Sequence, residues 1–229
     1  MLSFQQIYER AAELKGGTAA LEARLPQPRS AAELGAIPDH RFLAQMTKSI
    51  FQSGFVWQIV EAKWEGFERA FYGFDPQRWA DLPEDALRTL MDDDGVIRNW
   101  QKIKAVGSNA RFVVAMAERH RGFGHFLAQW PVEDITGLWL ELKNRGERLG
   151  GNTGPFFLRA MGKDTFLLTR DVSLALTEQG IIGKNPHAKQ SLKAAQQAFN
   201  RWRAESGRPL CHISRILAAT IPAKPSPSH

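Results

Sequence analysis

Cysteine is almost absent from this chain, which has one in 229 residues. The single thiol, Cys211, excludes an intramolecular disulfide framework and any zinc site built from several thiolates, and it is typical of a reducing cytoplasm. No apolar run approaches the roughly 20 residues that a membrane span needs. The N-terminus also lacks the basic start and apolar core of a signal peptide. We therefore expect no cofactor, no bound metal, no membrane partner and a cytoplasmic location.

Acidic residues are scarce in the C-terminal part of the chain. Residues 1–140 hold 16 Lys and Arg against 18 Asp and Glu, whereas residues 141–229 hold 14 against 6. A positive field concentrated in one region attracts a polyanion, and nucleic acid is the most common one. A basic surface that serves only solubility is the alternative that charge alone leaves open.

The sequence also lacks any stretch in which apolar and polar residues alternate, as they do in a β-strand. Apolar residues recur instead at three- and four-residue steps, which is typical of helices. These helical patterns cover residues 42–72, 99–118, 133–145, 156–161, 172–179, 188–204 and 210–219. Gly54 should divide the first pattern into two helices, and Asp75-Pro76 and Pro83 predict helix starts. We predict an all-α unit over residues 1–221, followed by a disordered tail over residues 222–229.

Three stretches of the chain resemble the 3-methyladenine DNA glycosylase I family: GFVWQIVEAKWEGFERAFYGFDP, DDDGVIRNWQKIKAVGSNARFV and LKNRGERLGGNTGPFFLRAMG. The order and spacing of their aromatic, Phe-Asp-Pro, Gly-x-Ile-Arg and Asn-Ala-Arg elements carry the resemblance, which covers residues 40–182. It implies a helix-hairpin-helix DNA glycosylase fold, formed as one unit or as two helical lobes with the DNA cleft between them. It also implies a monomer that acts on alkylated bases in double-stranded DNA of the bacterial cytoplasm or nucleoid.

The chain departs from that family at three places. The cysteines of the family's zinc cluster are missing, so the resemblance is to a variant that lacks the zinc ligands. The family has a pocket glutamate eight residues before its tryptophan, and here that position is Ser49. The aromatic pattern that the family's pocket takes from its N-terminal region is not legible in this chain.

The glycine-rich turn after residue 147 is the first candidate for a contact with DNA. Amides at a turn that opens a helix lack helical partners and can bind an anion, and glycines let a DNA backbone approach closely. We expect the amides of residues 151–154 to bind one phosphate, with Arg148, Arg145 and Lys143 adding charge. The phosphate-binding set is Gly150, Gly151, Asn152, Thr153, Gly154 and Arg148. A plain helix–helix turn with glycine caps is the alternative, which the resemblance and the basic C-terminal part disfavour.

The aromatic residues around Gly54 are the second candidate. An enzyme that reacts with a base takes it out of the stack and holds it between aromatic or apolar surfaces. The resemblance implies that Trp57 stacks on the base, that Ser49 lies in the same pocket, and that Gly54 and Phe55 form the wedge that enters the gap in the DNA. The alternative is that the cluster of Phe51, Phe55, Trp57 and Trp64 belongs to the core, where we place Trp64 in any case.

Asp171 is the third candidate. In the wider superfamily an aspartate follows the hairpin after a short apolar loop and stands at a helix start, and the segment around Asp171 is similar to that context. A carboxylate there can stabilise the cationic sugar as the glycosidic bond breaks, or orient water. The alternative is that Asp171 only caps its helix.

These features together predict a monofunctional DNA N-glycosylase that removes alkylated adenine. Asn152 and Thr153 occupy the end of the hairpin, where bifunctional relatives have a Schiff-base lysine, so strand cleavage is not expected. A non-catalytic protein that binds damaged or unusual DNA is the first alternative. A small-molecule enzyme or an interaction module is the second, and the hairpin and the charge distribution count against it.

Overall fold

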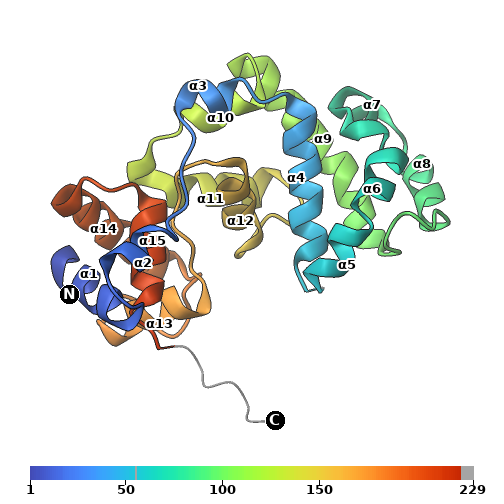
Figure 1. Ribbon diagram of the computed structural model, residues 1–229. Coiled ribbons are helices and arrows are strands. Elements are labelled where there is room, and N and C mark those ends of the chain that lie inside the picture. The colour runs from blue at the N-terminus through green and yellow to red at the C-terminus, as the bar shows by residue number, and fades with distance from the viewer. Residues whose placement is uncertain (55, 223–229) are drawn as a thin grey trace, which may run out of the picture. The chain divides into compact units, whose positions relative to one another are not determined.

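The structure is a computed structural model that describes residues 1–54 and 56–222, and it divides into two compact units. Unit 1 comprises Met1–Pro28, Val132–Thr136 and the chain from Asp164 onward, and unit 2 comprises Arg29–Pro131 and Gly137–Lys163. Helices and turns make up both units, and the described residues contain no β-strand, which confirms the all-α prediction (Figure 1). None of the helices found among these residues has the length and apolar character needed to cross a membrane.

Unit 2 is built around α9 (Trp100–His120), the longest helix in the described chain, which packs against α4 (Asp39–Gln52) (Figure 1). The other elements of this unit are α3 (Ala31–Gly35), α5 (Trp57–Ala62), α6 (Trp64–Ala70), η1 (Tyr72–Phe74), α7 (Pro76–Asp81), α8 (Glu84–Arg88), η2 (Thr89–Met91), α10 (Phe123–Gln129) and α12 (Thr153–Met161). Helix α11 (Ile135–Arg145) begins in unit 1 and continues into unit 2.

Aromatic side chains fill the core of unit 2. Phe51 and Phe67 are fully buried and meet edge to face, with ring centroids 4.7 Å apart. Phe42 and Phe112 pack on Phe123 of α10 at 5.3 and 5.4 Å. Each such ring that leaves water contributes about 1.5–3 kcal/mol, so these contacts fix the angle at which α4, α9 and α10 meet.

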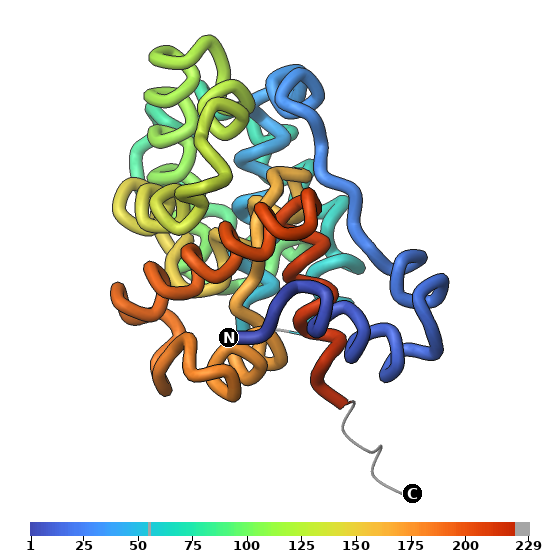
Figure 2. The backbone as a smooth tube through the Cα atoms, turned by 90° about the vertical axis from the view of Figure 1, so that its left-hand side faces the viewer, coloured from blue at the N-terminus to red at the C-terminus, as the bar shows by residue number. Residues whose placement is uncertain are grey.

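Unit 1 contains α1 (Phe4–Leu14), α2 (Thr18–Glu22), η3 (Val132–Asp134), α13 (Arg170–Glu178), α14 (Lys189–Ser206) and α15 (Leu210–Ala219). Helix α15, red in Figure 2, packs against α1, in dark blue, and also against α13. The carboxylate of Asp164 accepts hydrogen bonds from the amides of Leu210 and Cys211 at 2.9 and 2.8 Å, which satisfies the N-terminus of α15. Helix α15, which also packs against α14, is thus held at its N-terminus beside three helices.

The predicted helix boundaries agree with the structure in most places. Helix α4 ends at Gln52 and α5 starts at Trp57, so the predicted break at Gly54 is confirmed. The prediction of two helices in this stretch is wrong, because a second break at Lys63 separates α5 from α6. Helices α1 and α10 were not predicted. The predicted disordered tail falls almost wholly on residues 223–229, which lie outside the described residues.

Candidate functional site

The turn between α4 and α5 is exposed and apolar. Gly54 has a φ of 77°, a left-handed conformation that favours glycine, and a Cβ there would meet no other atom within 4 Å. Phe55, the other predicted wedge residue, lies outside the described residues. Beyond it, Val56, Trp57 and Ile59 are 58%, 51% and 47% exposed. We call these three residues, which are Val56 and the exposed start of α5, the apolar turn.

Trp57 is the aromatic centre of this turn. Its ring meets that of Phe156 of α12 edge to face, with centroids 5.9 Å apart and planes at 87°. One side of the indole is thereby held, while half of the side chain stays accessible. Trp57 is therefore not a core residue. Phe51 is one, and half-buried Trp64 is stacked on Phe67 at 5.5 Å, as the core assignment of Trp64 predicts.

Ser49 lies on α4 with only 7% of its surface exposed. Its hydroxyl accepts a hydrogen bond from the side-chain amide of Gln45 at 3.2 Å. A hydroxyl and an amide are both neutral, so the Ser49–Gln45 pair supplies no charge at this position.

Lys102 of α9 is a buried cation that the sequence analysis did not single out. Its Nζ donates to the carbonyl oxygens of Phe51 and Ser53 at 3.1 and 2.7 Å, and only 5% of the residue is exposed. These carbonyls end α4, where helical partners run out and where the helix dipole favours a positive charge. Lys102 therefore anchors the last residues before Gly54 and the apolar turn.

Replacing Lys102 by methionine should destabilise unit 2, because a side chain of similar length remains but two carbonyls lose their donor. A buried acceptor left unpaired costs about 1–3 kcal/mol. We expect a clear fall in the urea midpoint of unfolding, whereas the control Lys104→Met, on the same helix but half-exposed and paired with Glu84, should stay close to the wild type. Equal stability of both variants would show that Lys102 anchors nothing.

The loss of stability expected for Lys102→Met should depend on pH, and the direction of that dependence follows from the pKa of Lys102. Burial, first, and the nearby charge of Arg148, second, lower the pKa of Lys102 from its ordinary value of 10.5. The unfolded chain therefore holds this proton more tightly, and the free energy of unfolding rises with pH between the lowered pKa and 10.5. The Lys102→Met variant lacks this rise, so its stability deficit relative to wild type should grow from neutral to alkaline pH.

The glycine-rich hairpin joins α11 to α12. Arg148 and Gly151 have φ values of 60° and 61°, which reverse the chain direction. The amides of Thr153 and Gly154 donate to the carbonyls of Gly150 and Leu149 at 3.2 and 3.1 Å. The prediction that the amides of residues 151–154 bind a phosphate is therefore wrong for these last two, because the turn already uses them.

Two glycine amides of the hairpin stay available. Within the part of the chain that the structure describes, the N–H groups of Gly150 and Gly151 donate to no acceptor. Gly151 is exposed, and a Cβ on it would meet nothing within 4 Å. Gly154 serves packing instead, because its Cβ would lie 2.6 Å from the carbonyl oxygen of Leu149. The available amides of the hairpin thus lie at Gly150 and Gly151, beside exposed Arg148, whereas Asn152 is the N-cap of α12 and Thr153 its first residue.

Asn109 of α9 holds the hairpin in place. It is fully buried, its Nδ2 donates to the carbonyl of Glu147 at 3.1 Å, and its Oδ1 accepts from the amide of the same residue at 2.8 Å. The N–H and the C=O of Glu147 are thereby both hydrogen-bonded, so the residue that precedes the turn is held in a fixed position. In the sequence, Asn109 is marked only as the first residue of the Asn-Ala-Arg element.

Asp171 belongs to unit 1, in the first turn of α13. The N-cap of this helix is Thr169, whose hydroxyl accepts from the amide of Val172 at 3.3 Å. The carboxylate of Asp171 is half-exposed, with the guanidinium of Arg170 at 3.9 Å. Thr169, and not Asp171, is therefore the N-cap of α13, and the carboxylate of Asp171 is accessible in the first turn of that helix.

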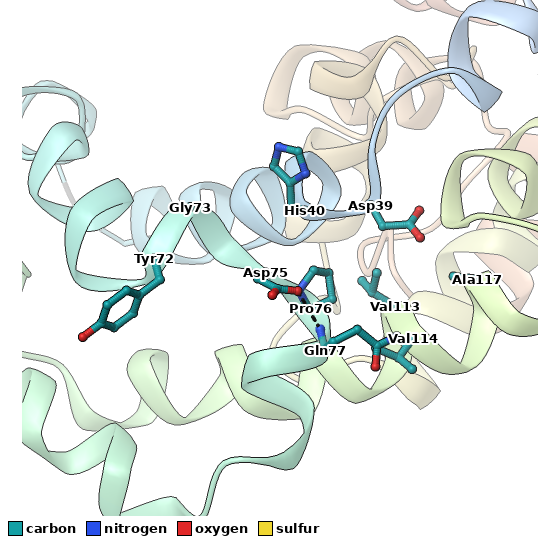
Figure 3. A pocket seen from close by; sticks show the side chains of 10 residues that line it. All are labelled: Asp39, His40, Tyr72, Gly73, Asp75, Pro76, Gln77, Val113, Val114 and Ala117. Carbon is teal, nitrogen blue, oxygen red and sulfur yellow. Dashed lines mark hydrogen bonds between the residues drawn. The ribbon is translucent and has the colours of Figure 1, made fainter.

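A cavity of about 400 Å³ in unit 2 holds none of the predicted site residues. Figure 3 shows Asp75 bound to the amide of Gln77 at 3.1 Å as the cap of α7, which confirms the predicted helix start. Asp39, on the opposite side of the cavity, accepts from the amide of Phe123 at 2.8 Å. The two carboxylates that line this cavity therefore serve local structure. Among the described residues no group of three His, Cys, Asp or Glu side chains is placed to hold a metal ion.

Comparison with known proteins identifies relatives for the middle of the chain. The methyladenine glycosylase family matches residues 36–146. DNA-3-methyladenine glycosylase 1 of Escherichia coli (strain K12) is 34% identical over 76 residues, which are 33% of this chain and 41% of that protein. The DNA-3-methyladenine glycosylase of Haemophilus influenzae is 32% identical over 76 residues, again 41% of its length. The chain thus spans less than half the length of these curated relatives.

Solved structures extend the similarity to nearly the whole chain. The 3-methyladenine DNA glycosylase I of Staphylococcus aureus matches with a TM-score of 0.50 at 20% identity, over 67% of this chain and 91% of that one. The 8-oxoguanine DNA glycosylase of Methanocaldococcus jannaschii matches with a TM-score of 0.54 at 14% identity, over 92% and 91%. Such low identities establish the fold alone. The resemblance to the methyladenine glycosylase family is thus confirmed over residues 36–146, and the chain has the helix-hairpin-helix DNA glycosylase fold.

Proposed function

We propose that this protein is a monofunctional DNA N-glycosylase that hydrolyses the N-glycosidic bond of alkylated adenine, such as 3-methyladenine, in double-stranded DNA. It would act as a monomer in base excision repair in the bacterial cytoplasm or nucleoid. One observation carries the proposal: Trp57 is half-exposed on an apolar turn and is held edge-on by Phe156 of the hairpin's second helix. Relatives matched over 76 residues of the chain are named for 3-methyladenine.

The roles follow from the chemistry of the described groups. Gly150, Gly151 and Arg148 bind a phosphate of the DNA backbone, a contact that carries no sequence information. Trp57 stacks on the extruded base, and an alkylated base with positive charge favours an indole face. Gly54 and its neighbours fill the gap left in the duplex. Asp171 stabilises the positive charge that grows on the sugar while the bond from its anomeric carbon to the base nitrogen breaks and water attacks.

The monofunctional assignment is supported by the end of the hairpin, where Asn152 and Thr153 offer no amine, and by the environment of buried Lys102 on α9. A Schiff base needs an accessible, unprotonated amine. Lys102 is buried and its Nζ is committed to two carbonyl oxygens of the end of α4. Hydrolysis by water, without cleavage of the strand, is therefore the reaction we expect.

A second candidate is a protein that binds damaged or distorted DNA without reacting with it. Ser49 favours it, because a buried, neutral Ser49–Gln45 pair lies at the position where the resembled family has its pocket glutamate.

Base release from methylated duplex DNA separates the two candidates. The enzyme proposal predicts free 3-methyladenine at a rate proportional to the protein, with intact strands, and binding that weakens with salt at a log–log slope near −0.9 per phosphate contact. Release of no base from a panel of alkylated and oxidised lesions, with DNA binding retained, would establish the non-catalytic candidate. Absence of DNA binding at low salt would overturn both.

A further inference from the structure

A small cavity in unit 1 combines an apolar floor with a charged rim. It has a volume of about 190 Å³ and lies against the end of α1, α2, the start of α13 and the last turns of α15. Leu21, Ala219 and Ile221 form the floor and are at most 8% exposed. The charged lining residues are Lys15, Arg24, Arg215 and Asp171. Three cations thus face one carboxylate in a single depression.

These three cations have no partner among the described residues. No ion pair or side-chain hydrogen bond within 1–54 and 56–222 involves Lys15, Arg24 or Arg215. Other arginines of the same unit do pair: Arg203 with Glu133 and Arg208 with Glu22, each at 2.7 Å. A cavity whose three cations outnumber its one carboxylate attracts an anion, because the low-dielectric floor focuses the field.

The size of the cavity limits the anion that it can take. Pockets for whole cofactors or drug-sized ligands measure about 300–1,000 Å³, so this one suits a compact group. Guanidinium groups match the oxygens of phosphate in a planar, bidentate geometry. We propose that Lys15, Arg24 and Arg215 form a binding site for one phosphodiester group of DNA, a second anchor besides the hairpin.

This assignment also gives Asp171 a place in the reaction. A carboxylate beside a phosphate site weakens the binding of phosphate, because both groups are negative. The phosphodiester, however, is attached to a deoxyribose, which becomes positively charged while its glycosidic bond breaks. With the phosphate on the three cations, the neighbouring sugar comes within reach of Asp171, whose charge then faces the growing positive charge. The inference rests on the proposed function for its partner, DNA.

The test is the salt dependence of binding to undamaged duplex DNA. The double variant Arg24→Gln/Arg215→Gln should bind more weakly at low salt, and its log–log slope should be smaller than that of the wild type by about 1. The control is Arg10→Gln/Lys193→Gln, which removes two exposed charges of the same unit outside the cavity. Asp171→Asn should act in the opposite direction and tighten binding several-fold.

The outcomes are distinct. A reduced slope in the cavity variant alone supports the site, even if the wild type releases no base, in which case only the glycosylase proposal fails. Equal slopes for the cavity variant and the control overturn the site, whether or not bases are released. Titration with inorganic phosphate separates the two sources of the anion: tight binding of free phosphate together with unchanged DNA binding in the cavity variant would also overturn it.

Discussion

Replacing Asp171 by asparagine should lower the rate of base release by about 10²–10³, the usual loss when one preorganised electrostatic group is removed from an active site. Asparagine keeps the shape of the side chain and removes only its charge. Folding should not change, because Thr169 and not Asp171 caps α13. Single-turnover release of 3-methyladenine at saturating protein measures the chemical step apart from binding.

Glu178→Gln is the matched control for this experiment. Glu178 is an exposed acid at the other end of the same helix, so its replacement removes one negative charge from α13 without touching the carboxylate of interest. Release should proceed there at the wild-type rate. If Asp171→Asn retains full activity on a confirmed substrate, Asp171 takes no part in the chemistry, and catalysis rests on stacking and on the lability of alkylated purines.

Trp57→Ala should lower base release by roughly 5- to 150-fold, because stacking of one base on an aromatic ring contributes about 1–3 kcal/mol. Stability should hardly change, since half of the indole is already exposed. Binding to undamaged duplex should survive, because the hairpin amides and Arg148 are intact. Release kinetics, urea unfolding and binding to undamaged DNA measure these three effects separately.

Two further variants make the result specific to stacking. Trp57→Phe keeps an aromatic face and should recover most of the activity. Tyr72→Ala removes another exposed aromatic ring of unit 2 and should leave release unchanged. A loss of stability in Trp57→Ala as large as its loss of activity would instead make Trp57 a structural residue that supports Phe156.

Local signals predicted most of the helices. Asp75 caps α7 as its Asp-Pro sequence indicates, and α13 begins at Arg170, two residues before the predicted helical pattern. Helix α10 was missed because Gly122 and Gly124 favour a loop in local sequence. Gly124 is there for packing: a Cβ on it would lie 2.1 Å from the carbonyl oxygen of Leu34 on α3. This close approach of α3 and α10 is a tertiary contact, which cannot be predicted from the local sequence around Gly124.

The site was predicted less completely than the fold. Lys102 and Asn109 are polar residue types, and polar types predict a surface position. Their spacing did hold a signal, since both lie at three- and four-residue steps with Val106 and Val113, on the apolar face of α9. A lysine within such a face must be paired when it is buried, and the pairing with carbonyls of α4 could be known only from the fold.

Helix α9 also sets the distance between the end of α4 and the start of the hairpin. Lys102 donates hydrogen bonds to the end of α4, and Asn109 is hydrogen-bonded to the start of the hairpin. The two residues are seven positions apart, which is about 10 Å along a helix. Substitutions between Lys102 and Asn109 change single contacts. An inserted or deleted residue would instead rotate the side chain of one of these residues relative to the other by about 100° around the helix axis. This segment therefore tolerates a substitution far better than a change of length, because the separation between the end of α4 and the start of the hairpin depends on the number of residues between Lys102 and Asn109.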